Sequence, residues 1–338
     1  MKEKLNMERL GNPWGPSPVL ERQRERIISE ADGIGSEKAR QLLKIKIADW
    51  IGVPLEQIGV SRGSSEIIEL ICQEMLANQA VVMPVPTYFG LTDSLKEAGS
   101  ELIEVPAGTG SQFVLNEQLA EELIITCQEN NAHLWLCSPN NPTGSVMESA
   151  LIEEIVTSLS NQLVIVDEAY LEYIDPKNNS SAAHLVGQHP NLIVTKTLSK
   201  AYALPDLRMG IMIADPQVAA YTQSRVSQSS PEDYIKARYA IDDQEHILKF
   251  AQWIKTEVAR LIAGIKILVD IEASVLSATG VMILKHKVES LYQLLKEMGI
   301  KSRDMNNEPG IEGERYVRVG LQKPELNGQF LHALASLG

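Results

Sequence analysis

Between residues 55 and 215 the chain alternates short apolar runs, rich in β-branched residues, with longer amphipathic runs. Seven of the short runs read as strands, several of them bounded by Pro, Gly or Asn: QIGVS, QAVVMP, LIEVP, HLWLCSP, LVIVDEA, LIVTKT and GIMIAD. Helical spacing marks three of the longer runs, SSEIIELICQEMLA, YFGLTDSLKEAG and SALIEEIVTSLS. Strands that alternate with helices in this way favour an α/β fold with a mainly parallel sheet.

After Asp215 the pattern changes. A helical stretch covers roughly residues 216–265, and a few strands and the helix VESLYQLLKEMG follow it. We therefore expect a large domain at residues 30–218 and a smaller α+β C-terminal domain at residues 219–338. Residues 1–29 include GNPWGPSP, which is too rich in Pro and Gly for a domain, and are expected to form an arm packed on the small domain.

The charge balance indicates a small molecule as the partner. The chain has 31 Lys and Arg against 44 Asp and Glu, a formal net charge of −13, which argues against binding to nucleic acid or anionic membranes. Its charged start lacks the apolar stretch of a signal peptide, and no apolar run approaches membrane-spanning length, so a cytoplasmic location is expected. Cys72, Cys127 and Cys137 show no CxxC spacing, so neither disulfides nor a metal site is expected.

Polar residues at strand ends carry most of the functional information, because ligands of open α/β sheets bind beyond the carboxyl ends of the strands. Asp167 ends a strand so apolar that its carboxylate is expected to be buried, which is costly unless a cation pairs with it. Asn141 lies in the turn SPNNPTG at the end of another strand. Each has a simpler explanation: Asp167 as a helix cap or core ion pair, and Asn141 as a loop residue.

Two further segments offer donors for a phosphate. SRGSSE follows a strand and opens a helix, so the backbone N–H groups and hydroxyls of Ser64 and Ser65 suit a phosphate, although serine at such a position is commonly just a cap. TKTLSKAYALPDLRMG adds the hydroxyls of Thr197 and Ser199 and the guanidinium of Arg208, which gives charge-assisted contacts. Together they form one candidate phosphate site.

Lys200 lies in the same segment, but the candidate phosphate site does not require it. A bound phosphate raises the pKa of a nearby amine and desolvation lowers it; if desolvation prevails, the neutral amine suits Schiff-base chemistry with an aldehyde. Pyridoxal 5′-phosphate combines an aldehyde, a phosphate and a ring nitrogen that must stay protonated, and Asp167 is the acidic partner that nitrogen needs. Alone, Lys200 would be a surface or phosphate-pairing lysine; the combination favours the cofactor.

In this order, the motifs SRGSSE, PTY, SPNNPTG, DEAYLEY and TLSKAYAL with LRMG resemble the class I/II aminotransferases of the fold type I pyridoxal-phosphate superfamily. Within that superfamily the similarity points to the histidinol-phosphate aminotransferases, and it extends from about Asn12 to Leu334. The resemblance implies a large domain with a seven-stranded, mainly parallel sheet, pyridoxal 5′-phosphate as the cofactor, and a homodimer.

The resemblance also implies a role for each matching residue. Lys200 is then the Schiff-base lysine and catalytic proton shuttle, and Asp167 pairs with the pyridine nitrogen. The remaining implied cofactor contacts are ring stacking by Tyr88, hydrogen bonds to the phenolic oxygen from Asn141 and Tyr170, and phosphate binding by Ser64, Ser65, Thr197, Ser199 and Arg208.

Three residues are assigned to the substrate by the same resemblance. YVRVGLQKPELN places Arg318 on the arginine that binds the substrate carboxylate, and Arg303 in SRDMNNEPG matches an arginine that helps to hold the substrate phosphate in the histidinol-phosphate branch. Trp14 in GNPWGPSP takes a place over the substrate that a tyrosine usually occupies.

The sequence departs from the family pattern at three places, which concern the substrate-binding region and the contact between subunits. Gly35 stands where the family carries a tyrosine that reaches the cofactor phosphate of the neighbouring subunit. The stretch RVSQSSPEDY follows the large domain and lacks the Pro-aromatic-Asn-type sequence that the family usually carries there. Gln322 replaces a glycine of the family's C-terminal strand motif. The resemblance therefore constrains the cofactor chemistry more than the substrate.

From these residues we expect an aminotransferase that acts on an amino acid or a phosphorylated amine derived from one, with a 2-oxo acid as the other small-molecule substrate. The changes at Gly35 and RVSQSSPEDY keep open a lyase, decarboxylase or cyclase on the same scaffold, which would retain Lys200 and Asp167. A non-catalytic cofactor-binding regulator is disfavoured, because it would typically carry a DNA-binding extension for which this chain has no room.

Overall fold

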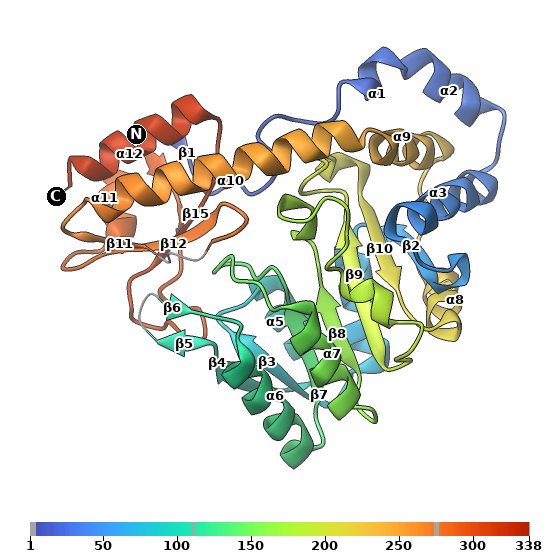
Figure 1. The fold of residues 1–338 in the computed structure, drawn as a ribbon, viewed down its shortest axis with the longest axis horizontal. Coiled ribbons are helices and arrows are strands. Elements are labelled where there is room, and N and C mark those ends of the chain that lie inside the picture. Colours follow the sequence, from blue (N-terminus) through green and yellow to red (C-terminus); the bar gives the residue numbers. More distant parts are fainter. Residues whose placement is uncertain (1–4, 110–111, 274–276, 338) are drawn as a thin grey trace.

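Two sheets organise the chain (Figure 1). The computed structural model describes residues 5–109, 112–273 and 277–337, so the first four residues of the charged start lie outside it. All seven predicted runs form strands of the larger sheet, which are, in their order across it, β2 (Ile58–Arg62), β10 (Met209–Ile213), β9 (Leu192–Thr197), β8 (Val164–Asp167), β7 (His133–Cys137), β3 (Ala80–Val85) and β4 (Glu101–Pro106).

The larger sheet is mainly parallel, as expected. Only β10 runs antiparallel to its neighbours, β2 and β9, while the other pairings are parallel. Successive side chains alternate between the two faces, so that Val164 and Val166 of β8 join one apolar cluster and Ile165 joins the other. Burial on both faces explains why these strands are continuous apolar runs in the sequence.

Helices cover both faces of this sheet. One face carries α4 (Ser64–Leu70), continued by a π-helical turn (Ile71–Met75), and α5 (Phe89–Glu97); the other carries α3 (Ser36–Ile51), α6 (Glu117–Asn130) and α7 (Ser149–Ser158). The predicted helices correspond to α4, α5 and α7. Helix α6 was not predicted from the sequence, although Asn116 caps it by accepting a hydrogen bond from Leu119 N at 3.0 Å.

Short 3-10 helices lie in the connections: η1 (Leu55–Gln57), η3 (Leu171–Tyr173), η4 (Ala182–Leu185) and η5 (Pro205–Leu207).

The helical stretch expected over residues 216–265 is divided into three helices, α8 (Pro216–Arg225), α9 (Pro231–Asp242) and α10 (Gln244–Lys266). A side chain caps each N-terminus by accepting a backbone N–H: Asp215, Ser230 and Asp243, respectively. Proline follows the first two caps, at the position where a helix tolerates it best. Capping residues inside the apolar pattern therefore set the breaks.

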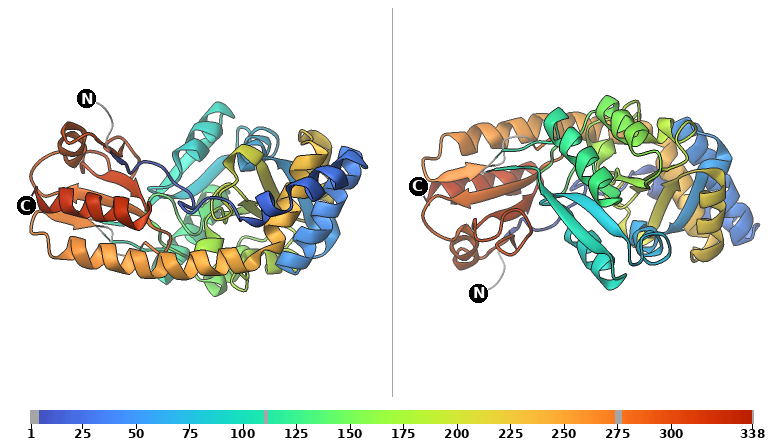
Figure 2. Two further views of the ribbon diagram at one scale, coloured as in Figure 1. Left: turned by 90° about the horizontal axis from the view of Figure 1, so that it is seen from above. Right: turned by 90° about the horizontal axis from the view of Figure 1, so that it is seen from below.

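The smaller sheet is antiparallel and has the order β11 (Ile271–Ala273), β12 (Val281–His286), β15 (Val317–Gly320), β14 (Arg303–Asp304). Beside it, α10 packs against α12 (Pro324–Ala335), and α11 (Leu291–Glu297) follows β12 (Figure 2). A two-stranded hairpin, β5 (Gly108–Thr109) and β6 (Gln112–Phe113), extends from the end of β4.

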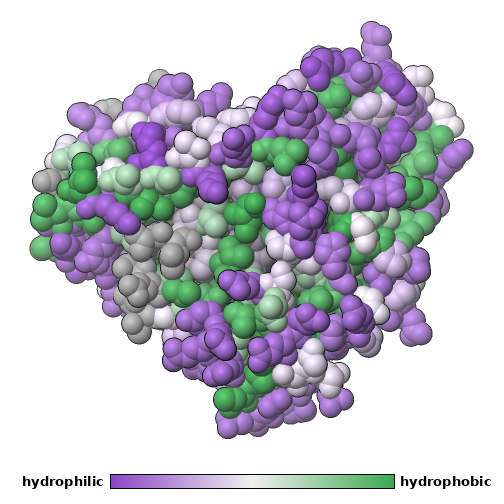
Figure 3. Space-filling model, in the orientation of Figure 1, coloured by the Kyte–Doolittle hydropathy of each residue, from purple (hydrophilic) through white to green (hydrophobic). Residues whose placement is uncertain are grey.

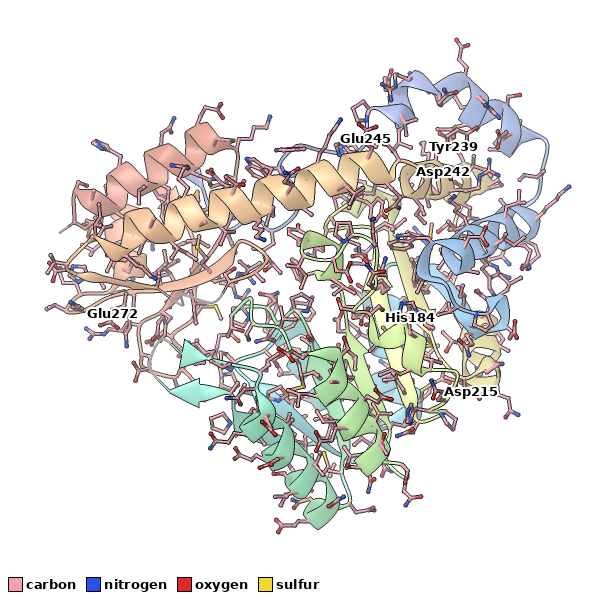
Figure 4. The ribbon with its side chains drawn as sticks, viewed as in Figure 1. His184, Asp215, Tyr239, Asp242, Glu245 and Glu272 are labelled. Atoms are coloured by element: carbon pink, nitrogen blue, oxygen red, sulfur yellow. The ribbon has the colours of Figure 1, made fainter. Side chains whose placement is uncertain are left out.

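The N-terminal segment connects the two sheets. Its β1 (Leu5–Asn6) pairs in parallel with β13 (Ile300–Lys301), and Asn12 then donates its backbone N–H to Lys200 O at 3.1 Å. Further on, α1 (Val19–Arg22) and α2 (Arg24–Asp32) lie along α9. Tyr239 of α9, labelled in Figure 4, donates its hydroxyl to Glu30 of α2 at 2.7 Å.

Among the described residues, no helix is long and apolar enough to cross a bilayer. In the view of Figure 3, hydrophilic residues predominate over α1 and α2, and apolar residues gather at the edge formed by the smaller sheet and α12. Asp215 follows the end of the antiparallel strand β10, so it lies at the sheet edge opposite to the carboxyl ends of the parallel strands (Figure 4).

Gly210 of β10 allows the start of α4 to lie directly on the sheet. A Cβ at this position would come within 2.5 Å of Ser64 N and 2.6 Å of Gly63 O, both of them backbone atoms. We predict that Gly210→Ala lowers the free energy of unfolding by about 1–3 kcal/mol, because the backbone at residues 63–64 must move away. Urea unfolding measures this change.

Gly328 provides the matched control for that prediction, since it lies within α12 and a Cβ there meets no atom within 4 Å. The same Gly→Ala change should raise the free energy of unfolding by about 0.5–1 kcal/mol, through the higher helix propensity of alanine. Equal stability of Gly210→Ala and the wild type would contradict the close contact between β10 and α4.

Candidate active site

All ten residues predicted to hold or activate the cofactor line one cavity, of about 230 Å³, at the carboxyl ends of β7, β8 and β9. These residues are Ser64, Ser65, Tyr88, Asn141, Asp167, Tyr170, Thr197, Ser199, Lys200 and Arg208. The sequence reading did not assign the other lining residues, which are Ile68, Cys137, Pro139, Ala169 and Pro205. Apolar residues of this kind do not by themselves indicate a binding site. Only their positions next to the sequence motifs could have assigned them to the cavity.

Asp167 is a buried carboxylate at the end of β8. It is 7% exposed, and its Oδ1 accepts the backbone N–H of Ala169 at 3.0 Å. Burial raises the pKa of this carboxyl to about 6, while the Ala169 amide and the Lys200 charge act in the opposite direction. Among the described residues, no ion pair within 4 Å includes Asp167. The carboxylate therefore faces the cavity without a cationic partner of its own.

Lys200 lies in the loop after β9 and lines the same cavity as Asp167. Its Nζ lies 5.6 Å from the centroid of the Tyr170 ring. Burial lowers the pKa of this amine, the nearby Arg318 guanidinium lowers it further, and Asp167 raises it. The carbonyl of Lys200 accepts N–H groups from Asn12 and Ala203, both at 3.1 Å, so the backbone is fixed while the amine points to the cavity.

The predicted phosphate donors converge from three segments. Thr197 Oγ1 donates to Ser199 Oγ at 3.1 Å and accepts the Ser199 backbone N–H at 3.1 Å, which folds the turn after β9. Arg208 adopts a left-handed backbone conformation, with φ at 49°. Its guanidinium lies over Gly63, where a Cβ would come within 3.1 Å of Arg208 Cζ. The guanidinium thus lies at the start of α4, beside the N–H groups of residues 64 and 65.

Asn141, Tyr88 and Tyr170 also line the cavity. Asn141 Oδ1 accepts a long hydrogen bond from Arg318 Nη1, at 3.4 Å. The Tyr170 hydroxyl is buried and has no hydrogen-bond partner among the described residues, and burial raises its pKa. Asn140, which the sequence reading passed over, holds the loop by donating to Pro86 O at 2.9 Å.

A buried charge cluster supports the segment that carries Tyr170. Lys196 Nζ lies 2.9 Å from Glu168 and 3.0 Å from Glu172, and all three side chains are at most 2% exposed. Glu168 also accepts hydrogen bonds from Ser181 Oγ and the Ala182 N–H. Because Tyr170 lies between the two glutamates in sequence, the cluster fixes the segment that presents its hydroxyl.

The predicted substrate residues lie outside this cavity. Arg303 and Arg318 are directly paired across β14 and β15, and Arg318 contacts the site through Asn141. Trp14 packs on α10, with its ring centroid 5.3 Å from that of Trp253. It lines a larger neighbouring cavity of about 920 Å³, which also includes Lys200.

The structure places the three departures from the family pattern as follows: Gly35 lies before a helix, residues 225–234 join two helices, and Gln322 contacts the N-terminal segment. Gly35 precedes α3, and a Cβ there would meet no atom within 4 Å. The stretch at residues 225–234 contains the end of α8 and the start of α9. Gln322 ties down the N-terminal segment, since its side-chain amide donates to Arg9 O at 2.8 Å.

Pyridoxal phosphate, the cofactor expected from the sequence, fits these residues. A buried carboxylate without a cation matches a protonated ring nitrogen, and the orphaned Tyr170 hydroxyl matches a ring oxygen. The hydroxyls of Ser64 and Thr197, with Arg208, form a donor set for a phosphate. Lys200 supplies an amine whose pKa is lowered, as covalent attachment to an aldehyde requires.

Comparison with known proteins identifies the class. Residues 17–334 match the family described as aminotransferase class I and II, and the chain belongs to that family. A curated relative, histidinol-phosphate aminotransferase 1 of Archaeoglobus fulgidus, is 30% identical over an alignment of 332 residues that covers 96% of this chain and 96% of the relative.

Solved structures agree on the fold. The crystal structure of histidinol-phosphate aminotransferase from Clostridium acetobutylicum matches with a TM-score of 0.86 at 21% identity, and 99% of each chain is covered. That of the enzyme from Sinorhizobium meliloti in complex with pyridoxal-5′-phosphate matches with a TM-score of 0.82 at 20% identity, covering all of this chain (100%) and 92% of the other.

The raised pKa of Asp167 leads to a stability prediction. In the cofactor-free protein this pKa is about 6 against an ordinary value of 3.8, so folding favours the protonated carboxyl and ionisation destabilises the fold. At pH 7.5, Asp167→Asn should therefore raise the free energy of unfolding of the cofactor-free protein by roughly 1–3 kcal/mol. The gain should shrink as the pH falls through 6 toward 4, where the wild-type carboxyl also becomes neutral.

Urea unfolding at pH 7.5 and pH 4.5, with and without the cofactor, measures this effect. With pyridoxal phosphate bound, the order of the two proteins should reverse, because the variant loses the pairing with the ring cation. A cofactor-free Asp167→Asn protein that is less stable than the wild type at pH 7.5 would contradict the account of an uncompensated carboxylate.

Proposed function

We propose that this pyridoxal-phosphate-dependent aminotransferase exchanges an amino group between a 2-oxo acid and an amino acid or a phosphorylated amine derived from one, in the manner of the histidinol-phosphate aminotransferases. The observation that carries the proposal is the pair of guanidiniums beside the cofactor cavity. Arg303 and Arg318 are directly opposite on β14 and β15, and Arg318 reaches the cavity through Asn141. Like charges at such positions repel. Glu308 lies 2.9 Å from Arg303, and Arg318 is left to pair with an anionic group of the substrate.

When bound, pyridoxal phosphate supplies an aldehyde that takes up the amino group and a ring that accepts electrons from the substrate carbon. Asp167 would hold the proton on the ring nitrogen, and Tyr170 and Asn141 would hold the ring oxygen. Ser64, Ser65, Thr197, Ser199 and Arg208 would hold the phosphate. Lys200 would hold the aldehyde carbon until the substrate amine displaces it. Its freed Nζ would then take the proton from the substrate carbon and deliver it to the former aldehyde carbon, on the other side of the nitrogen.

The environment of Lys200 suits this role. A general base must be neutral at the working pH, and burial together with the Arg318 charge lowers the pKa of the amine. Arg318 thereby has two effects in the proposal: it binds the substrate carboxylate, and it disfavours the protonated form of the amine. Binding of that carboxylate weakens the second effect, so the amine becomes more basic when substrate is present.

We also propose that the working form is a homodimer, as the resemblance implies. In that form the cofactor phosphate would lack the tyrosine that the family supplies from the neighbouring subunit, since Gly35 offers no side chain. The phosphate donors of the chain itself would then carry a larger share of cofactor binding.

Two arginine variants test the proposed substrate. Arg303→Ala should slow the half-reaction with histidinol phosphate by about 10- to 100-fold, the effect of losing a charged hydrogen bond, and should change the rate with alanine little. Arg318→Ala should slow glutamate and alanine to a similar degree, because both carry the common carboxylate. The change in cofactor absorbance to the amine form gives each rate.

Arg315→Ala is the matched control, since Arg315 lies on the same part of the chain but donates to the backbone carbonyl of Val288. It should leave all three rates unchanged. If the wild type does not react with histidinol phosphate and Arg303→Ala affects no substrate, the histidinol-phosphate assignment is wrong. Decay of the substrate with the cofactor returned to its aldehyde form would instead identify a lyase, decarboxylase or cyclase.

A further inference from the structure

Arg303 already has an internal partner. Its Nη2 donates to Glu308 Oε1 at 2.9 Å, and the side chains are 26% and 14% exposed, respectively. On the other side, the guanidinium lies over the ring of Phe89, with Cζ 3.7 Å from the ring centroid. Phe89 begins α5 and directly follows Tyr88, which lines the cofactor cavity. The ion pair therefore lies beside the reaction site.

The carboxylate of Glu308 is held in place by its loop. The backbone N–H of Glu308 donates to Met305 O at 3.1 Å, and its carbonyl accepts from Ile311 N at 3.2 Å. Gly310 packs against the end of β3, where a Cβ would come within 2.9 Å of Val85 Cγ2. The loop thus contacts both sheets, and this contact limits how far Glu308 can move from Arg303.

The charged side chains around Arg303 and Arg318 carry a small net charge. Arg303 and Arg318 contribute two positive charges and Glu308 one negative charge, which leaves a single net positive charge. Glu8 also acts on Arg318, but it is paired with Lys301 at 2.9 Å. If Arg318 binds the common carboxylate of an amino acid, no net positive charge remains for a second anionic group.

We propose that Glu308 is a specificity-determining residue, an internal counter-ion of Arg303 that disfavours substrates with a charged distal group. This inference rests on the proposed function and narrows its substrate class. The preferred substrate is an amino acid whose distal group is neutral and polar, able to accept a hydrogen bond from Arg303 and donate one to Glu308. A distal phosphate or carboxylate must compete with Glu308 for the same guanidinium, at the cost of like-charge repulsion.

The test compares substrates that differ only in distal charge. Glutamate and glutamine form one pair, and aspartate and asparagine form another. In Glu308→Gln, the preference for the charged member, measured as the ratio of half-reaction specificity constants, should rise about tenfold, the effect of removing one nearby charge. Glu314→Gln is the matched control, because it removes another ion-paired carboxylate of the same loop, bound to Lys285 at 2.9 Å, and should leave both ratios unchanged.

A binding measurement separates this inference from the proposed reaction. Isothermal titration of the cofactor-loaded protein with glutarate and glutaramate, which carry no amino group to transfer, should show about tenfold tighter binding of glutarate by Glu308→Gln and unchanged binding of glutaramate. In an Arg303→Ala background, the Glu308→Gln change should have a clearly smaller effect on glutarate binding, because only the like-charge repulsion remains once the shared guanidinium is gone; a merely structural role would not predict this coupling.

The outcomes distinguish the two proposals. If histidinol phosphate does not react but the glutamate-to-glutamine ratio rises in Glu308→Gln, the histidinol-phosphate assignment fails and the role of Glu308 stands. If the protein transfers no amino group at all, the titrations alone decide the role of Glu308. Glutarate binding that is unchanged by Glu308→Gln, or undetectable in both proteins, overturns the inference about Glu308.

Discussion

A carboxylate that lacks a cation is the constraint on which the site depends. Asp167 ends a central strand of a sheet covered on both faces, and its burial raises the pKa to about 6. Such a group is destabilising unless something positive comes to it. The structure supplies no ion-pair partner within 4 Å from the described residues, and the cavity in front of Asp167 is lined by phosphate donors and by Lys200. The missing cation is best supplied by the ring of pyridoxal phosphate.

The rest of the fold brings the other groups to that carboxylate. Parallel pairing of β7, β8 and β9 puts Asn141, Asp167 and Lys200 at one edge of the sheet. The antiparallel strand β10 brings Arg208 to the same edge, because its residues run in the opposite direction and Arg208 precedes its start. The close contact between Gly210 and the start of α4 then places the phosphate donors of residues 64 and 65 beside that arginine.

The sequence was informative about the fold and the cofactor for a physical reason. Strand ends next to buried apolar runs leave few positions for polar side chains, so Asp167, Lys200 and Arg208 stood out, and all ten predicted cofactor residues line one cavity. The helix breaks at residues 226–230 and 243 were missed because capping residues, rather than a loss of apolar residues, set them.

The substrate side was harder to predict, because it depends on contacts between distant segments. Glu308 lies five residues after Arg303 in a loop without periodicity, and only the packing of Gly310 on β3 brings its carboxylate to the guanidinium. Nothing in the local pattern distinguishes it from Glu312 or Glu314. The charge balance around the two arginines therefore became visible only in three dimensions.

Chemical mapping of the cofactor attachment tests the central claim most directly. Reduction of the cofactor-loaded protein with borohydride, followed by proteolysis and mass spectrometry of the peptides, reports which lysine carries the cofactor. We predict label on Lys200 and none on Lys196, which lies four residues away but is buried in its ion pairs with Glu168 and Glu172. Label on any lysine other than Lys200, or no covalent label at all, would contradict the account.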